Sequence, residues 1–117
     1  MKTDIFFGQD EAVAKWVFDR LGMKLARPYR AIGLLEILPS GEGRLVGGWV
    51  LNGYNGANVD MSLALAPGVP LHRRHMRGVA EYVFHRLQCT RVTARTRVGN
   101  AQMLDLLERL GFHTEGK

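Results

Sequence analysis

Three arginines and two histidines fall within seven residues of this chain, where a helix is predicted to begin. The segment reads Leu-His-Arg-Arg-His-Met-Arg over residues 71–77. Apolar residues then follow at the i, i+3, i+4, i+7 spacing of one helix face: Met76, Val79, Ala80, Val83, Phe84 and Leu87. Cations at a helix N-terminus oppose the dipole at a cost of about 0.3–1 kcal/mol each. A phosphate bound to the free N–H groups would offset that cost, although a solvated basic face would carry the same charges.

The positive charge of the chain is concentrated around this segment. Residues 71–97 contain seven arginines and one acid, a net of +6, whereas the other 90 residues sum to −1. All seven cations are arginine, whose planar guanidinium suits phosphate better than the point charge of lysine. The distribution favours a polyanionic small molecule or a nucleic acid as partner.

Length and composition predict one globular domain over residues 1–117. With 46% hydrophobic residues, the chain can bury a core of its own. Cys89 is the single cysteine, which excludes an intramolecular disulfide. No convincing third ligand accompanies His72 and His75, so we expect no metal site. No apolar run has the length of a signal peptide or membrane span, and we expect a cytoplasmic protein without membrane contact.

The N-terminal half predicts a helix followed by a hairpin. Asp10 can cap a helix that ends at Gly22 and is buried through Val13, Trp16, Val17 and Leu21. Residues 31–38 and 44–51 are then expected to form two antiparallel strands joined by the Ser-Gly-Glu-Gly turn.

The C-terminal half predicts a strand on either side of the basic helix. Strand 57–65 alternates apolar and small or polar residues, and strand 91–98 follows the helix. A strand, helix, strand sequence of this length implies a parallel pair. Asn100 can cap a last helix that ends at Gly111, and Phe112 begins a short extended tail.

In this order of elements, the chain resembles the GNAT superfamily of acetyl-CoA-dependent N-acetyltransferases. The strongest match runs from Arg-Val-Thr-Ala-Arg (91–95) through Gly-Asn-Ala (99–101) to Leu-Glu-Arg-Leu-Gly-Phe (107–112). The spacing of Ala-Ile-Gly (31–33), Leu-Val-Gly-Gly (45–48) and Asp-Met-Ser (60–62) also resembles a small phage-associated subgroup.

The resemblance implies a fold of the α/β (α+β) class and a cosubstrate, acetyl-CoA. The sheet would be mixed and mostly antiparallel, flanked by helices, with one parallel strand pair around the cofactor cleft. Coenzyme A would lie between the strands that end near Leu65 and Val98. The residues implied in binding it are Leu63, Ala64 and Leu65 along the pantetheine, with His72, Arg73, Arg74, Arg77 and Asn100 near the phosphates.

Three departures from the family pattern accompany the match. No glycine occurs between Pro70 and Arg77, where the family has a glycine-containing pyrophosphate loop, so arginine side chains are expected to substitute for the backbone cradle. Leu107 occupies the position where the family often has a tyrosine that protonates the leaving thiolate. The chain stops at Lys117, where family members usually add two strands.

Acetyl transfer to an amine needs a base, because only the neutral amine attacks a thioester. Asp60 and Glu36 are the candidate bases, directly or through water, and Tyr54 is a candidate acid. Strand carboxylates are as readily explained by solvation or ion pairing. The predicted function is therefore transfer of an acetyl group from acetyl-CoA to an amine that the sequence does not identify.

A rival interpretation keeps the GNAT fold without catalysis. Such a protein would bind coenzyme A, or would bind a nucleic-acid backbone through Arg91, Arg95 and Arg97 on one strand face. A homodimer is also expected, because a sheet that ends at strand 91–98 leaves an unpaired edge. A native chain longer than this one is the alternative explanation of that edge.

Overall fold

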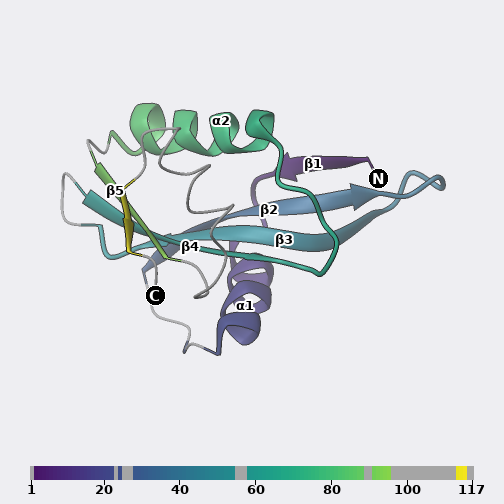
Figure 1. Ribbon diagram of the computed structural model, residues 1–117, viewed down its shortest axis with the longest axis horizontal. Helices are drawn as coiled ribbons and strands as arrows, with labels where there is room; N and C mark the ends of the chain where they lie inside the picture. Colours follow the sequence, from purple (N-terminus) through teal and green to yellow (C-terminus); the bar gives the residue numbers. More distant parts are fainter. Residues whose placement is uncertain are drawn as a thin grey trace.

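A six-stranded sheet with the strand order β1-β2-β3-β4-β5-β6 forms the centre of the molecule (Figure 1). The computed structural model describes residues 2–22, 24, 28–54 and 58–88, and the strand backbone of 91–95 and 113–115. The strands are β1 (Thr3–Phe6), β2 (Tyr29–Ile37), β3 (Gly43–Asn52), β4 (Asn58–Leu65), β5 (Arg91–Arg95) and β6 (His113–Glu115). Each strand therefore lies beside its neighbours in the chain.

The predicted antiparallel hairpin is confirmed as β2 and β3, both slightly longer than expected. The two strands pair from Tyr29↔Asn52 at one end to Ile37↔Gly43 at the other. β4 pairs antiparallel with β3, starting from Asp60↔Asn52. One end of the sheet thus holds the starts of β2 and β4, and we call it the β4-start end; the opposite end, with the β2–β3 turn, is the hairpin end.

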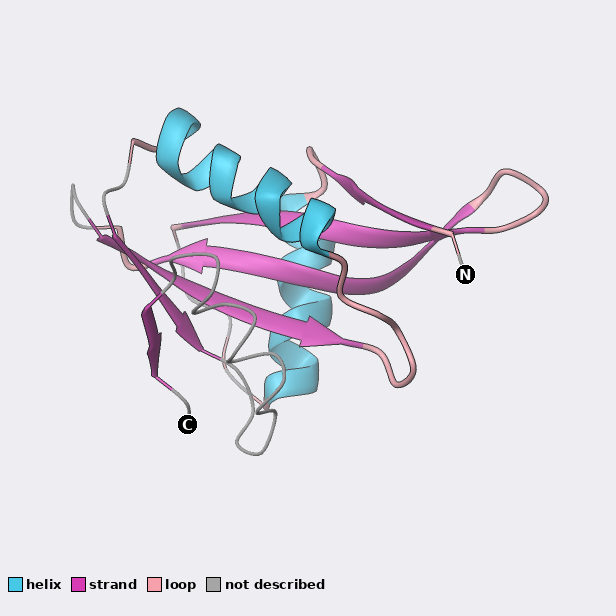
Figure 2. Ribbon diagram, turned by 45° about the horizontal axis from the view of Figure 1, so that its top comes forward, coloured by secondary structure: helices cyan, strands magenta, loops and turns pink. Residues whose placement is uncertain are grey.

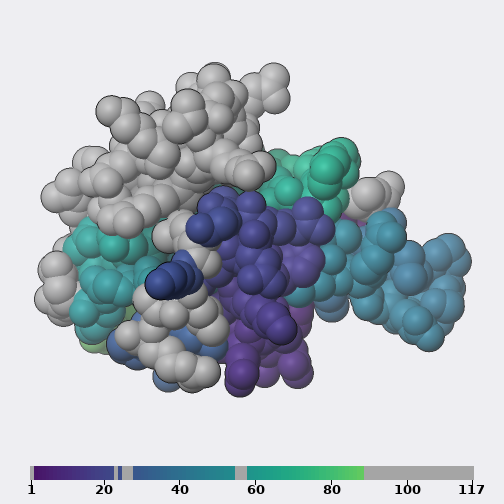
Figure 3. All heavy atoms as spheres, turned by 90° about the horizontal axis from the view of Figure 1, so that it is seen from below, coloured from purple at the N-terminus to yellow at the C-terminus, as the bar shows by residue number. Residues whose placement is uncertain are grey.

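Helices cover both faces of the sheet. α1 (Asp10–Leu21) packs on one face, and α2 (Arg73–Glu81) with its π-helical continuation η1 (Tyr82–Arg86) packs on the other (Figures 1 and 2). Figure 3 looks onto the α1 face, where the purple atoms of α1 lie beside the projecting β2–β3 hairpin. Gly48 permits this close packing, because a Cβ there would lie 2.6 Å from Cγ1 of Val13.

The start of α1 differs from the prediction. Gln9 is the N-cap and Asp10 is the first helical residue, with no side-chain cap hydrogen bond. The carboxylate of Asp10 instead lies 4.0 Å from the guanidinium of Arg30 on β2. The predicted end is confirmed, since Gly22 adopts the left-handed conformation with a φ of 69°.

The buried face of α1 is also turned slightly from the predicted one. Its buried residues are Val13, Ala14, Val17 and Phe18. Trp16 and Leu21, expected in the core, are only half-buried and border it. Trp16 lies at this border because its ring stacks beneath the guanidinium of Arg20, 4.1 Å from the ring centroid.

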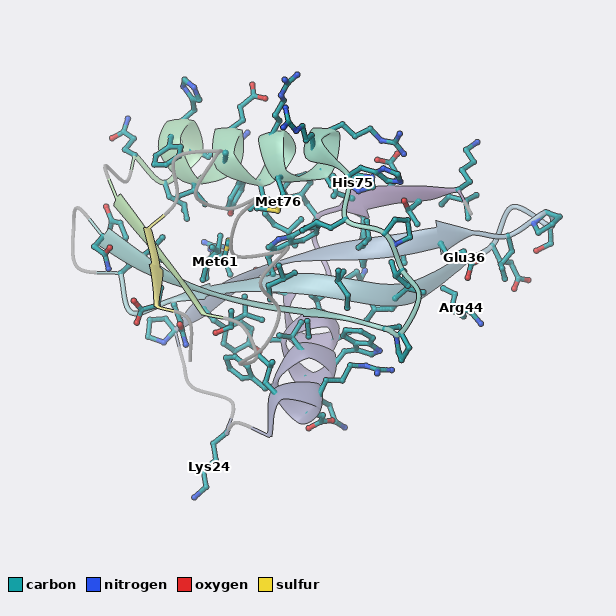
Figure 4. All side chains as sticks on the ribbon, in the orientation of Figure 1. Lys24, Glu36, Arg44, Met61, His75 and Met76 are labelled. Atoms are coloured by element: carbon teal, nitrogen blue, oxygen red, sulfur yellow. The ribbon has the colours of Figure 1, made fainter. Side chains whose placement is uncertain are left out.

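The basic helix begins at Arg73, with His72 as N-cap, so Leu71 precedes it. Its predicted apolar face is confirmed: Met76, Val79 and Val83 are buried, and Ala80, Phe84 and Leu87 are half-buried. Figure 4 shows Met76 directed from α2 toward the sheet, where Met61 belongs to the same core. The π-helical turn at its end was not predicted.

The C-terminal strands confirm one parallel pair and add a second. β4 and β5 pair in parallel from Asn58↔Arg91 to Ser62↔Arg95. β6 pairs with β5, also in parallel, so the expectation of an unpaired edge at β5 is wrong, and the second parallel pair was not expected. The outermost described strand on this side of the sheet is β6. The homodimer stays a prediction.

Two further differences concern the chain ends. β1 was not predicted; it pairs antiparallel with β2 from Thr3↔Glu36 to Phe6↔Gly33. The predicted last helix, with Asn100 as its cap, lies outside the described residues, as do Cys89 and residues 96–98. Within the described part of the chain, none of the helices combines the length and apolar character needed to cross a membrane.

Candidate functional site

β4 is the strand that leads toward α2. It pairs in parallel with β5 from Asn58↔Arg91 to Ser62↔Arg95 and antiparallel with β3 up to Gly47↔Leu65. The three residues predicted to pair with pantetheine, 63–65, are the last three of this strand. Residues 96–98, which follow β5, lie outside the described part of the chain.

A tight turn leads from β4 to α2. Pro67 and Gly68 are its central residues, Gly68 has a φ of 78°, and the N–H of Val69 donates to the carbonyl of Ala66 at 3.2 Å. This is the arrangement of a type II turn, in which glycine is favoured at the third position. The turn redirects the chain from the end of β4 toward the start of α2.

α2 begins without a side-chain cap. His72, its N-cap, makes no such hydrogen bond, and the first bonds to the His72 carbonyl come from the N–H groups of His75 and Met76, at 3.1 and 3.3 Å. The N–H groups of Arg73 and Arg74 precede these bonds. Uncapped N–H groups at the positive end of a helix dipole are suited to an anion.

The predicted phosphate-binding arginines divide into two kinds. A guanidinium nitrogen of Arg74 donates to the backbone carbonyl of Thr3 at 3.0 Å, so this side chain is tied to β1. Arg73 and Arg77 are exposed, and in the described part of the chain no carboxylate lies within ion-pair distance of either. These two arginines are available to an anion without losing another contact.

His75 is buried beneath the first turn of α2, 1% exposed, beside β1 (Figure 4). Its Nε2 lies 3.3 Å from the Thr3 carbonyl, and its Nδ1 has no hydrogen-bond partner among the described residues. Burial lowers the pKa of His75 below 6.5, and the charges of Arg74 and His72 lower it further, against the Thr3 hydrogen bond and Asp4. The neutral ring therefore donates its Nε2–H to the Thr3 carbonyl.

Two of the three candidate catalytic residues lie at the β4-start end. Asp60 pairs with Asn52 on β3 and with Thr93 on β5. Its carboxylate lies against Gly53, where a Cβ would be 2.9 Å from Oδ2. Tyr54, the next residue, is 55% exposed and donates its hydroxyl to the Leu87 carbonyl at 3.4 Å.

Glu36 lies at the hairpin end, far from the other two candidates. It pairs across the hairpin with Arg44 and forms an ion pair with its guanidinium (Figure 4). Glu36 lies seven positions after Tyr29 on β2, roughly 23 Å in an extended strand. The structure therefore places Asp60 and Tyr54 at the same end of the sheet and Glu36 at the other.

A pocket of about 380 Å³ opens at the β4-start end, beside Asn52 and Tyr54. Its apolar lining comes from Pro28, Leu51, Val59 and Leu87, and Tyr29 adds a further ring. Arg30 and Arg86 also line it, and we call it the Arg30–Arg86 pocket. Two neighbouring hollows, of about 330 and 410 Å³, share Arg86 with it and contain the Phe7–Tyr82 ring pair.

Sequence reasoning missed this pocket and the contacts on the Thr3 carbonyl. Arg30 and Arg86 lie 56 positions apart in the sequence, and no periodicity connects them. The sequence did not indicate that Arg74 contacts β1, because β1 itself was not predicted. Asn100 lies outside the described residues. Among the residues that the structure describes, no group of three metal-ligating side chains occurs, and the expected absence of a metal stays a prediction.

Comparison with known proteins connects this geometry to a fold. The chain resembles the N-acetyltransferase PseH of Campylobacter jejuni, whose crystal structure was determined in complex with acetyl coenzyme A. The TM-score is 0.58 at 12% sequence identity, over 93% of this chain and 85% of that chain. No protein-family model and no curated protein matches the sequence. The GNAT fold expected from the sequence is confirmed, and an identity this low shows the fold alone.

Proposed function

We propose that this protein transfers an acetyl group from acetyl-CoA to an amine. The observation that carries the proposal is the path from β4 to α2. A tight turn joins the end of β4 to an uncapped helix that presents Arg73 and Arg77. In a GNAT fold this path offers a strand edge to pantetheine and a helix start to the pyrophosphate.

The cofactor residues in this proposal are those predicted from the sequence, with one change of role. The backbone of residues 63–65 pairs with pantetheine, and Arg73 and Arg77 bind phosphate oxygens beside the N–H groups that follow His72. Arginine side chains replace the missing glycine cradle, since guanidinium matches phosphate geometry in a bidentate manner. Arg74 acts mainly as a positioning residue, because it is bound to the Thr3 carbonyl.

Asp60 is the proposed base. It lies on β4 three residues before Leu63, the first residue proposed to pair with pantetheine, a separation of roughly 10 Å along the strand. It takes the proton of the attacking amine directly or through one water, the new C–N bond forms, and the C–S bond breaks. Tyr54 is the proposed donor of the proton to the leaving thiolate. The negative charge on the thioester oxygen is stabilised by a backbone N–H of β4. Glu36 is left out, because it is ion-paired at the other end of the sheet.

Calorimetric titration with acetyl-CoA tests the cofactor half of the proposal. We expect the double variant Arg73→Ala, Arg77→Ala to bind acetyl-CoA roughly ten-fold more weakly or worse, since charge-assisted hydrogen bonds contribute about 1.5–3 kcal/mol each. Arg20→Ala, on the opposite face of the sheet, is the matched control and should bind as the wild type does. Equal affinity in the wild type and the double variant would show that the two arginines are ordinary surface charge.

Thiol release from acetyl-CoA in the presence of amines tests the transfer itself. A panel should cover a protein N-terminus, a lysine peptide, a polyamine and small aromatic amines. Binding of acetyl-CoA without thiol release for any of them would favour the rival interpretation, a coenzyme A-binding protein that does not catalyse.

A further inference from the structure

The Arg30–Arg86 pocket has a composition that the proposed cofactor chemistry does not explain. We propose that it selects acceptors that carry an anionic group, a carboxylate or a phosphate, on an apolar or aromatic body. Arg30 and Arg86 bind the anion, while the body rests on the apolar wall. This inference rests on the acetyltransferase function proposed above and names the class of its acceptor.

The charges of the pocket favour an anionic ligand. Both arginines line it, and none of its described lining residues is a carboxylate, whereas Glu81 and Asp10 each line one of the two neighbouring hollows. Asp10 reaches Arg30 only at 4.0 Å, and among the described residues no carboxylate lies within that distance of Arg86. Two cations on one small cavity repel each other, and a bound anion turns that repulsion into attraction. Guanidinium groups bind carboxylate and phosphate in the same bidentate manner.

The apolar wall of the pocket favours a ligand with an apolar or aromatic body. Leu51, Val59 and Leu87 line the interior, and Tyr54 lies at its edge with its ring exposed. A volume of about 380 Å³ falls within the range of small-molecule sites, which combine apolar walls with a few orienting polar groups. An apolar or aromatic body of the ligand would cover this wall and bring its charged end to the arginines.

The position of the pocket is consistent with an acceptor site. Asn52 and Tyr54 line it, and the residue between them, Gly53, lies against the carboxylate of Asp60. The pocket therefore lies at the same end of the sheet as the proposed base. Arg86 belongs to a π-helical turn, a rare distortion that is frequent at functional sites.

Three matched amines test the proposal by calorimetry, without acetyl-CoA. They are 4-(aminomethyl)benzoate, 4-(aminomethyl)phenyl phosphate and the neutral 4-(aminomethyl)benzamide. We expect at least one anionic amine to bind roughly five-fold more tightly than the amide or better. Arg30→Gln and Arg86→Gln should each remove most of that preference. The more tightly bound anionic amine identifies the anion as carboxylate or phosphate.

Arg20→Gln is the control, because it removes the same charge on α1 away from the pocket. The proposal is overturned if the amide binds as tightly as both anionic amines, if Arg20→Gln loses as much preference as the pocket variants, or if none of the three binds at millimolar concentration. Binding is measured without the transfer step, so a protein that prefers the anionic amines yet releases no thiol would refute the transfer reaction and leave the anion site standing.

Discussion

The two ends of α2 are built in opposite ways. At its N-terminal end, Arg74 and His75 both contact the Thr3 carbonyl of β1. At its C-terminal end the helix becomes a π-helical turn, and three hollows meet at Arg86. The first end is tethered to the sheet, and the second is open.

The difference suits the two substrates of the proposed reaction. Acetyl-CoA is the same molecule in every turnover, and a helix start held by backbone contacts keeps its arginines and N–H groups in place. The Arg30–Arg86 pocket at the open end is the proposed acceptor site. The tethered cofactor end and the open acceptor end should therefore respond differently to substitution.

The largest effect is expected from Asp60→Asn. Loss of a general base lowers rates by roughly 10²–10⁴-fold, and the amide cannot accept the proton of the amine. The rate of thiol release at saturating substrates should fall by that order, while the calorimetric affinity for acetyl-CoA stays within about two-fold.

Glu36→Gln is the matched control for Asp60→Asn. It makes the same chemical change at the hairpin end, where the carboxylate is ion-paired with Arg44, and should leave the rate of thiol release nearly unchanged. A rate that falls in Glu36→Gln and holds in Asp60→Asn would reverse the assignment of the base and place the chemistry at the other end of the sheet.

The next largest effect is a pH dependence of the free energy of unfolding, which arises at the tethered end. The pKa of His75 is lowered in the folded state, chiefly by burial, from its ordinary 6.5. The unfolded chain therefore takes up a proton near pH 6.5 while the folded chain does not. The contribution of His75 to the free energy of unfolding is complete above pH 6.5 and falls below it, by at most about 1.4 kcal/mol per pH unit.

Urea unfolding at a series of pH values, with His75→Gln beside the wild type, measures this contribution. Glutamine can still donate to the Thr3 carbonyl but does not titrate, so the variant should lose stability less steeply below pH 6.5. His85→Gln, an exposed replacement on η1, should keep the slope of the wild type. Parallel slopes in the wild type and His75→Gln would mean that the buried ring does not remain neutral.

Much of the fold could be predicted because it depends on local patterns. The strand alternation in residues 58–65 and the helical spacing after Met76 each fix which side chains face the core, and the parallel pair follows from the length of the crossover. β1 was missed because it has four residues, too few for a periodic signal. The phage-associated subgroup, the homodimer and the cytoplasmic location stay predictions.

Part of the candidate site could also be predicted from the sequence, and part could not. The helix start with Arg73 and Arg77 was visible in the sequence, because those residues lie four positions apart on one helix. The Arg30–Arg86 pocket was not, because tertiary packing alone brings β2 and η1 together. Arg74 shows the same limit: its charge was predicted, whereas its contact with Thr3 depends on how β1 lies beside α2.

A smaller effect separates the arginines of the tethered end. Arg74→Ala loses its hydrogen bond to the Thr3 carbonyl and should lower the free energy of unfolding by about 1 kcal/mol relative to Arg77→Ala. Both changes remove one cation near the start of the same helix, so relief of the helix dipole largely cancels in the difference. Denaturant midpoints of the two variants, measured side by side, check this. Equal midpoints would mean that Arg74 does not tether α2 to β1.

The smallest effect is expected at the open end, from Tyr54→Phe. The hydroxyl donates to the Leu87 carbonyl at 3.4 Å, a long hydrogen bond, and the residue is 55% exposed, so water replaces the bond readily. The free energy of unfolding should change by less than about 0.5 kcal/mol. The rate of thiol release should fall only a few-fold, because a thiolate leaves without full protonation and needs little help from an acid. A loss of stability as large as that of Arg74→Ala would mean that this end of α2 is tethered too, through Tyr54, and the contrast between the two ends would not hold.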